Sequence, residues 1–460
     1  MYPSDTICAI ATATAPSGIG IIRISGKDAI AVTDTIFRAA NHKKLSEAAA
    51  YTMHYGFIYD QDQMIDEVLV SVFRAPHSYT AEDSVEINCH GGPFILQKVL
   101  KLLTQKGIRI AEPGEFTKRA FLNGRLDLSE AEAVMDTISA QNEFALEASV
   151  KQLRGELSQL IRTLRQDILY EIAFIESALD DPEHISLEGY SEKLTEKCKA
   201  LLSQVETLIA SYQNGKIRKE GIYTVILGKP NAGKSSLLNL LLGENRAIVT
   251  DIAGTTRDVL EEDILLNGMQ LHLVDTAGIH SSEDTIEQMG VEKAIEYANR
   301  ADLILYLLDG STPITEEDIR IARIVQDKKV MVLLNKKDLT QSIGEEDIKS
   351  ILPRPVAILP ISALKGEGME EMAAILKDLF YEGEVTMNDQ IYLTNLRHKQ
   401  LMDQVKQSLL QVLHSLDQQM PEDFLSIDLM DAYKNLGFII GEEIDDDLAD
   451  EIFSKFCMGK

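Results

Sequence analysis

A phosphate-binding loop in the middle of the chain is the feature that most constrains its fold. Residues 228–236 read Gly-Lys-Pro-Asn-Ala-Gly-Lys-Ser-Ser and fill every position of the pattern G-x-x-x-x-G-K-[ST]. An apolar, β-rich run (222–227) precedes the loop and a helical run (236–242) follows it, as the motif requires. Backbone N–H groups of such a loop surround phosphate oxygens, the lysine reaches the β- and γ-phosphates, and the serine ligates Mg²⁺. The loop predicts an α/β nucleotide-binding domain with contacts from Asn231, Ala232, Gly233, Lys234, Ser235 and Ser236, Lys234 being a catalytic candidate and Ser235 a Mg²⁺ ligand.

Two further motifs predict that the base is guanine rather than adenine. Asn335-Lys336-Lys337-Asp338 follows the apolar run 329–334, and Ser-Ala-Leu-Lys at 362–365 follows the strand-like run 356–361. An aspartate carboxylate accepts two hydrogen bonds from the N1–H and exocyclic amine of guanine, whereas adenine offers a different donor pattern. The predicted base-side contacts are Asn335, Lys336, Asp338, Ser362, Ala363 and Leu364.

The segment between these loops carries two switch motifs. Asp275-Thr276-Ala277-Gly278 follows the run 270–274, and we expect Asp275 to hold Mg²⁺ through water and the Gly278 N–H to sense the γ-phosphate. Thr255 and Thr256 are both candidates for the switch threonine on Mg²⁺. The predicted GTP contacts here are Thr250, Asp251, Ile252, Ala253, Gly254, Thr255, Thr256, Asp275, Thr276, Ala277 and Gly278.

The chain lacks the glutamine with which Ras-like enzymes orient the attacking water. Ile279 and then His280 occupy that place. His280 is one candidate base, but a lone histidine is usually solvated, and Glu287, further along the segment, is the better candidate. Arg257 could act as an arginine finger, although an exposed pair with Asp258 is the simpler interpretation.

Length and composition predict a soluble, cytoplasmic, multidomain protein. The 460 residues allow two to four domains, and 45% of them are hydrophobic. No apolar run approaches the ~18 residues of a membrane span, and we expect neither a leader nor a membrane partner. The four cysteines are far apart and suggest neither zinc nor disulfides.

The net charge of −28 argues against binding nucleic acid by bulk electrostatics. An RNA substrate would therefore need a local basic patch or a basic partner. Lys216, Arg218 and Lys219 form one small basic cluster, which we interpret as a solvated linker.

The chain divides into four segments. Residues 1–120 read as mixed α+β, residues 121–217 as helical, residues 218–382 as the GTPase domain, and residues 383–460 as helical again. Ser129 and Glu132 predict a capping box at the start of the first helical segment. We expect one helical domain split by an inserted Ras-like P-loop GTPase domain, with two separate bundles as the alternative.

The chain ends in Cys457-Met458-Gly459-Lys460, which does not fit a prenylation box. A terminal cysteine usually has no special role. A small flexible tail can instead place a thiol and an amine into a pocket, so Cys457 is a second catalytic candidate.

The set of motifs resembles the MnmE (TrmE) family of tRNA-modification GTPases along the whole chain. The phosphate loop alone is generic, whereas the set is specific. The resemblance rests on residues 5–12 (DTICAIAT), 18–25 (GIGIIRIS), 89–93 (CHGGP), 113–117 (PGEFT), 120–128 (AFLNGRLDL), 250–258 (TDIAGTTRD) and 457–460 (CMGK).

For the ends of the chain, the resemblance implies a domain that dimerises and binds 5-formyl-tetrahydrofolate or a related one-carbon folate. Arg23, Glu86, Arg125 and Lys460 match the folate-contacting positions, with Arg125 where some members have lysine. It also implies a partner, the flavoprotein MnmG (GidA). The two proteins would convert C5 of the wobble uridine (U34) of certain tRNAs to an aminomethyl or carboxymethylaminomethyl form.

For the GTPase domain, the resemblance implies K⁺-activated hydrolysis with paired domains. K⁺ would be held by Asn231 and by the carbonyls of Thr250, Ile252 and Thr255. Glu287 matches the water-positioning acid, and Ser235 and Thr256 match the Mg²⁺ ligands. K⁺ would then do the work of an arginine finger.

Two other function classes remain open at this level. A regulatory or ribosome-assembly switch GTPase would need the same nucleotide motifs but neither a folate site nor a Cys-x-Gly-Lys tail. A folate-dependent one-carbon enzyme with an accessory GTPase would turn over folate without tRNA. Motifs and fold alone do not name the substrate.

Overall fold

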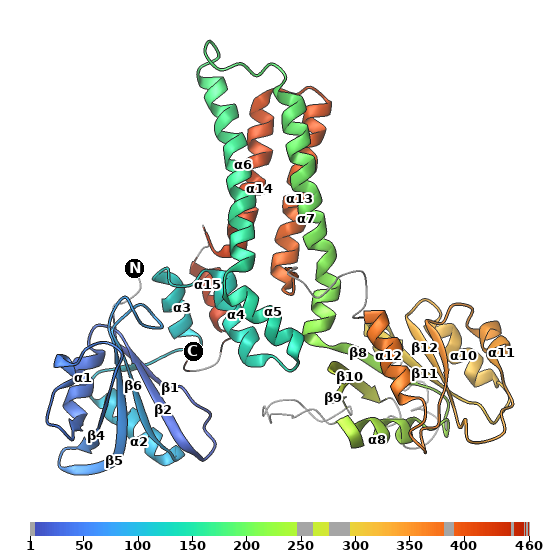
Figure 1. Cartoon of the computed structure of the whole chain (residues 1–460), viewed down its shortest axis with the longest axis horizontal. Helices are drawn as coiled ribbons and strands as arrows, with labels where there is room; N and C mark the ends of the chain where they lie inside the picture. Colours follow the sequence, from blue (N-terminus) through green and yellow to red (C-terminus); the bar gives the residue numbers. More distant parts are fainter. Residues whose placement is uncertain are drawn as a thin grey trace. The chain divides into compact units, whose positions relative to one another are not determined.

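The structure is a computed structural model that describes residues 5–245, 261–275, 295–380, 391–442 and 446–454, together with 456 and 459. It contains two compact units (Figure 1). The first comprises Met1–Ser139, Ser149–Val205 and Gln400–Lys460, and the second comprises Ala140–Ala148 and Glu206–Lys399. The predicted boundaries at 120/121, 217/218 and 382/383 stay predictions.

The first unit begins with a seven-stranded sheet whose order is β3-β4-β5-β6-β2-β1-β7. Its pairs are antiparallel except β1 with β7. Ile22 and Ile24 of β2 pack in the core with residues of α1 and α2, so the alternation of a strand turns Arg23 to the other face. The elements are β1 (Ile7–Ile10), β2 (Ser17–Ser25), α1 (Ala29–Ile36), β3 (Phe37–Ala39), β4 (Thr52–Asp60), β5 (Gln63–Phe73), β6 (Ser84–Gly91), α2 (Pro93–Gln105), β7 (Arg109–Ile110) and α3 (Glu115–Leu122).

Helices from the segments before and after the GTPase domain form one domain. In Figure 1, α6 and α14 run side by side, and Arg165 of α6 is buried against the ring of Tyr433 in α14. The single split helical domain is therefore confirmed, and the alternative of two separate bundles is wrong. The helices are α4 (Leu128–Ser139), α5 (Glu143–Leu153), α6 (Glu156–Asp180), α7 (Tyr190–Glu220), α13 (Leu396–Asp417), α14 (Glu422–Ile440) and α15 (Asp446–Ser454).

Two local predictions about this region are wrong. The capping box of α4 is formed by Asp127 and Glu130, because the Glu130 N–H donates to Asp127 Oδ1 and the Asp127 N–H donates to Glu130 Oε2. Ser129 is buried and its hydroxyl bonds instead to that of Ser158. The basic cluster lies on α7 rather than in a linker, and Arg218 is buried beside the rings of Phe144 and Tyr392, whose centroids are 5.4 and 5.6 Å from its guanidinium.

The second unit contains a six-stranded sheet of order β13-β12-β11-β8-β10-β9. Every pair is parallel except β10 with β9. Apolar clusters fill both faces, so β11 is buried at every position, as expected for a central parallel strand. The elements are β8 (Ile222–Leu227), α8 (Lys234–Asn245), β9 (Glu261–Leu266), β10 (Met269–Asp275), β11 (Leu303–Asp309), α10 (Glu316–Val325), β12 (Val330–Asn335), α11 (Glu345–Ile351), β13 (Ala357–Pro360) and α12 (Met369–Phe380).

This sheet is a Ras-like P-loop domain, so the predicted fold class is confirmed. Ligands of open α/β sheets bind at the carboxyl ends of the parallel strands. The loops that follow β8, β12 and β13 are the phosphate loop and the two predicted base-side loops. The fold therefore brings motifs that are more than a hundred residues apart to one edge.

Candidate functional site

The phosphate loop turns sharply between β8 and α8. Asn231 has φ +61° and Gly233 has φ +103°, so both lie in the left-handed region. A Cβ at Gly233 would lie 2.2 Å from the Asn335 side chain, which explains why glycine is needed there. The Lys234 ammonium donates to the carbonyls of Gly228, at 2.6 Å, and Lys229, at 3.0 Å. These contacts hold the largely buried ammonium against the loop backbone, in the lining of the cavity described next, where it can meet a phosphate group.

A cavity of about 600 Å³ joins the phosphate loop to both base-side loops. Its size suits a nucleotide-sized ligand. Asn231, Ser235 and Ser236 are exposed in it, whereas Ala232 lies buried behind the loop. The lining residues are Pro230, Asn231, Gly233, Lys234, Ser235, Ser236, Asn335, Lys336, Asp338, Leu339, Ser362, Ala363 and Leu364.

Asn335 ties the three loops together. Its Nδ2 donates to the Ala232 carbonyl at 2.8 Å, and its Oδ1 accepts from the Ala363 N–H at 2.9 Å. The side chain is buried at the end of β12. Both halves of the amide are used by protein, so Asn335 shapes the site from behind.

Asp338 is prepared to accept hydrogen bonds from a base. The Ser362 hydroxyl donates to its Oδ1 at 2.8 Å, and this bond is the main reason why the pKa of Asp338 lies below its usual value. The carboxylate is therefore ionised at neutral pH. An ionised carboxylate is an acceptor only, as recognition of the guanine N1–H and amine requires.

Sequence reasoning missed Asp309, which lies behind this loop. Its Oδ2 accepts from the Lys336 ammonium at 2.6 Å. Burial would raise the pKa of Asp309, but the bonds from Lys336 and Ser311 outweigh burial and leave the pKa lowered. No nucleotide motif contains this aspartate, so only the tertiary structure reveals it.

Several predicted residues lie outside the described part of the chain, and Asp275 is described only as the last residue of β10. The structure therefore leaves their predicted roles as predictions. They are Thr250, Asp251, Ile252, Ala253, Gly254, Thr255, Thr256, Arg257, Asp258, Thr276, Ala277, Gly278, Ile279, His280, Glu287, Cys457 and Lys460.

A second cluster lies on the face of the N-terminal sheet opposite α1 and α2. Arg23 faces Glu86 across β2 and β6, with 2.8 Å between Nη2 and Oε1. The Arg23 guanidinium lies 5.2 Å from the ring centroid of Tyr79 and 5.7 Å from that of Phe116, and its Nη1 donates to the Gly459 carbonyl at 3.1 Å. The penultimate residue of the chain thus reaches this cluster.

Arg125 joins the same cluster through Tyr79. Its guanidinium lies 5.0 Å from the Tyr79 centroid, and its Nη1 donates to the Tyr79 carbonyl at 3.1 Å. The structure brings Arg23, Glu86 and Arg125 together around one aromatic ring. Sequence reasoning missed Tyr79, whereas Phe116 lies within one of the motifs noted above.

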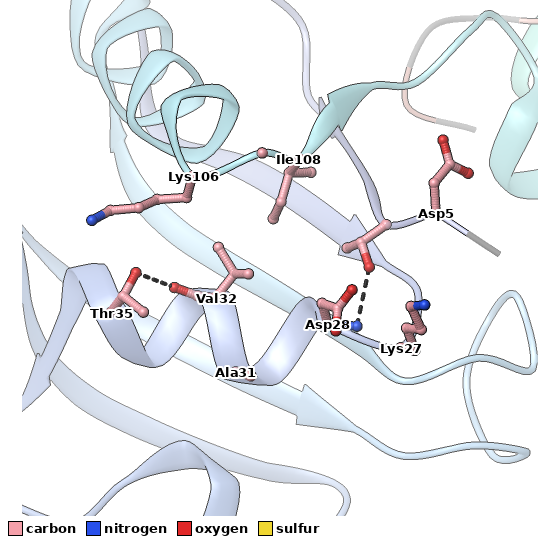
Figure 2. Close-up of a pocket in the computed structure, with 10 residues that line it drawn as sticks. Asp5, Lys27, Asp28, Ala31, Val32, Thr35, Lys106 and Ile108 are labelled. Atoms are coloured by element: carbon pink, nitrogen blue, oxygen red, sulfur yellow. Dashed lines mark hydrogen bonds between the residues drawn. The ribbon is translucent and has the colours of Figure 1, made fainter. Parts of the chain in front are cut away.

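A larger depression of about 760 Å³ lies elsewhere on this domain and has a different character (Figure 2). Figure 2 shows Lys27 and Asp28 at the start of α1, and Lys106 just after α2. These three side chains are exposed, and none belongs to a predicted site. The depression is lined by residues outside every predicted site, so we assign the chemistry to the other two clusters.

The described thiols are poor nucleophiles. Burial raises the pKa of Cys8, Cys89 and Cys198 to about 12. Within the described residues, no group of three or more histidine, cysteine, aspartate or glutamate side chains could hold a metal ion. Among the helices that the structure describes, none is both long and apolar enough to cross a bilayer.

Comparison with known proteins gives full-length matches. A family model described as GTP-binding protein TrmE N-terminus matches residues 6–125, and the MnmE helical domain matches residues 128–457. The tRNA modification GTPase MnmE of Lachnoclostridium phytofermentans is 53% identical over 99% of this chain and 100% of its own length. MnmE of Clostridioides difficile is 47% identical over 100% of both chains.

A solved structure of Aquifex aeolicus Era bound to GDP·AlF4⁻ is 31% identical over 41% of this chain and 67% of its own, with a TM-score of 0.29. That match is partial, so the assignment rests on the family models and the full-length relatives. On those matches, this chain belongs to the MnmE (TrmE) family of tRNA modification GTPases.

Proposed function

We propose that this chain is a K⁺-activated GTPase that acts with the flavoprotein MnmG to modify C5 of the wobble uridine in certain tRNAs. The product is the aminomethyl or carboxymethylaminomethyl form. The observation that carries the proposal is a cavity lined by the phosphate loop and both base-side loops, in a chain whose full length matches tRNA modification GTPases. Membership in another family of phosphate-loop GTPases would explain the cavity, but it would not explain the sequence similarity to MnmE along the whole chain.

GTP would bind with its phosphates on the loop at 231–236 and its base against Asp338. Lys234 is buried beneath the loop and supplies a fixed positive charge that favours the charge developing on the transferred phosphoryl group. The exposed hydroxyl of Ser235 is a hard oxygen donor of the type that Mg²⁺ prefers, and Thr256 would complete the pair. Glu287 would position the attacking water, since Ile279 cannot.

Asn231 is the described residue that fits a monovalent cation. Its left-handed conformation exposes its amide at the lining of the cavity, beside the exposed Ser235. An amide oxygen suits K⁺, with the remaining oxygens expected from Thr250, Ile252 and Thr255. A cation held there would supply the charge that an arginine finger supplies elsewhere.

The potassium proposal has a direct test. GTP turnover should be fast in KCl and slow in NaCl at matched ionic strength, and Asn231→Ala should lose most of the stimulation while still binding GTP. Asn299→Ala, on an exposed helical position of the same domain, is the matched control. Equal GTP turnover in both salts would refute the K⁺ mechanism. Full stimulation of the Asn231→Ala variant by K⁺ would show that Asn231 is not a K⁺ ligand.

The cluster around Tyr79 would bind 5-formyl-tetrahydrofolate or a related folate. Two guanidinium groups and an aromatic ring can contact a planar heterocycle and carboxylates, and Glu86 can accept hydrogen bonds from ring N–H groups. A bound folate would supply a one-carbon unit. Lys460 would join the site because Gly459 already contacts Arg23.

The tail gives Cys457 a proposed role in the modification step. We expect Cys457→Ser to fold and to hydrolyse GTP but to fail in tRNA modification. Normal modified tRNA from that variant would remove the thiol from the mechanism.

The assembly would be a homodimer through the N-terminal domain, joined by MnmG, in the cytoplasm. A chain of charge −28 is poorly suited to holding tRNA by itself, so MnmG would carry most of the tRNA contact.

The test of the whole proposal is a mass-spectrometric nucleoside profile of bulk tRNA from cells that lack this protein. The C5-aminomethyl-type uridines should disappear and return with the intact chain. An unchanged profile, in cells that contain MnmG and no second copy, would favour a switch GTPase whose output is binding alone.

A further inference from the structure

Two buried acids from one strand–loop–helix unit hold two lysines of the nucleotide site. Asp309 ends β11, and Asp318 lies in the first turn of α10. Lys336 Nζ lies 2.6 Å from Asp309 Oδ2, and Lys229 Nζ lies 2.9 Å from Asp318 Oδ2. Neither acid belongs to a nucleotide motif, and the Asp318 side chain is only 1% exposed.

Asp318 is fixed by its own helix. The N–H and hydroxyl of Thr315, the N-cap residue, donate to its Oδ2 at 2.9 and 2.6 Å. The buried Tyr306 hydroxyl donates to the Asp318 carbonyl at 2.8 Å. The carboxylate is therefore a rigid acceptor to which the Lys229 ammonium is anchored.

Lys229 passes this anchoring on to the phosphate loop. Its own carbonyl accepts from the Lys234 ammonium at 3.0 Å and from the Ala232 N–H at 3.3 Å. Holding the side chain of Lys229 thus limits the position of the carbonyl that orients Lys234. Lys234 is thus linked to Asp318 through one ion pair, the residue Lys229 and one hydrogen bond.

Asp309 acts in the same way on the base-side loop. Its Oδ1 accepts from the Ser311 hydroxyl at 2.6 Å and from the Ser311 N–H at 3.0 Å, which leaves Oδ2 to Lys336. Lys336 has φ +63° and stands two residues before Asp338. The pair therefore holds a strained loop residue next to the carboxylate that faces the base.

Fold stability alone does not require these ion pairs. A well-packed apolar pair often stabilises a core as well as a buried ion pair does, because burying charges is costly. Both cations nevertheless come from loops that line the nucleotide cavity or adjoin it. We propose that Asp309 and Asp318 are positioning residues of the GTP site, Asp318 setting the phosphate loop through Lys229 and Asp309 setting the base-side loop through Lys336.

The Asp318 arm is tested with the full-length chain and a fluorescent GDP. Lys229→Met and Asp318→Asn should each weaken GDP binding about tenfold, and the double variant should bind no more weakly than either, because one interaction is lost in all three. The conservative variant Lys229→Arg should bind GDP as the unaltered chain does, since its guanidinium can still reach the Asp318 carboxylate. The matched control is Lys349→Met, which removes an exposed lysine paired with Glu345 on α11.

Three outcomes overturn this arm. GDP binding that is unchanged in Lys229→Met while the unfolding temperature falls would make the pair merely structural. Losses that add in the double variant would place the two residues in separate roles. An equal loss in Lys349→Met would make the effect one of net charge. If Lys229→Met does not unfold cooperatively, Asp318→Asn and Lys229→Arg decide the same question.

The Asp309 arm has a different readout. Inosine diphosphate (IDP) lacks the exocyclic amine of guanine, from which the Asp338 carboxylate would accept a hydrogen bond. The ratio of GDP affinity to IDP affinity therefore reports the placement of Asp338. Asp309→Asn should lower that ratio several-fold, whereas Asp318→Asn should weaken both nucleotides equally. An unchanged ratio in Asp309→Asn would overturn this arm. The inference rests on nucleotide binding at this cavity, so failure of the unaltered chain to bind GDP would refute the proposed function itself, not the anchors.

Discussion

Replacing Asn335 by alanine should damage the nucleotide site more than its position behind the cavity suggests. The Asn335 amide is buried and makes two hydrogen bonds, to the Ala232 carbonyl and from the Ala363 N–H. The substitution leaves both backbone groups buried without their partner. Each such group costs about 1–3 kcal/mol, so the two together cost ~2–6 kcal/mol.

This cost falls where GDP binds, because Ala232 and Ala363 belong to loops on the two sides of the cavity. Where about 2 kcal/mol of this cost is relieved in the free chain by displacement of the two loops, GDP must reverse that displacement on binding, and its affinity falls about 30-fold. We therefore expect Asn335→Ala to weaken GDP binding at least about 30-fold in an equilibrium fluorescence titration. Asn299→Ala, which changes an exposed helical asparagine, should bind as the unaltered chain does.

Asn335→Asp separates the two bonds. It keeps an acceptor for the Ala363 N–H but places a carboxylate oxygen beside the Ala232 carbonyl, so it should weaken binding as much as alanine or more. The reasoning is refuted if Asn335→Ala binds GDP within threefold of the unaltered chain. In that case the loops are held by other contacts and Asn335 is dispensable.

Three further outcomes are expected. Gly233→Ala should abolish measurable GDP binding, since its Cβ would lie 2.2 Å from the Asn335 side chain at φ +103°, and binding within tenfold of the unaltered chain would contradict this. The hydrogen bond to Asp263 raises the pKa of His272, in β10, above its ordinary 6.5. The protonated imidazole therefore stabilises the fold fully below about pH 6.5, and this stabilisation is lost as the pH rises through the raised pKa. The unfolding temperature should fall over that pH interval, and His272→Gln should remove this pH dependence. Tyr79→Leu loses both arginine contacts at about 0.5–1 kcal/mol each, so calorimetry should show 5-formyl-tetrahydrofolate binding weakened about fivefold or more, with a smaller effect of Tyr79→Phe.

The sequence predicted the elements whose signal is local. The runs 222–227, 270–274, 329–334 and 356–361 all contain strands of the second unit, because each is a continuous apolar segment next to a recognisable loop, although β13 at the sheet edge is only half-buried. The strands β3 and β7, with three and two residues, were not predictable, since they are too short to show alternation.

The errors arose where neighbouring signals compete. Asp127 and Ser129 are both good N-cap residues, and the choice between them depends on where the preceding turn ends and on the burial of Ser129 against Ser158. Arg218 looked like a solvated charge because its partners Phe144 and Tyr392 are 74 and 174 residues away. Lys229 likewise has a partner that no local pattern indicates, because Asp318 lies 89 residues further along the chain.

The packing of α6 against α14 has a consequence for synthesis. The apolar stripe of α6, which includes Ile161, Ile168 and Ile175, is buried in a domain whose other half begins after the GTPase domain. On the ribosome the part of this stripe that α14 covers therefore has no partner helix while the intervening residues are made. At ~5–20 residues per second that wait is on the order of 10–50 seconds. During that time the GTPase domain can fold as a unit. The first helices form a nascent intermediate with exposed apolar surface, which is prone to aggregate and is therefore a substrate for chaperones.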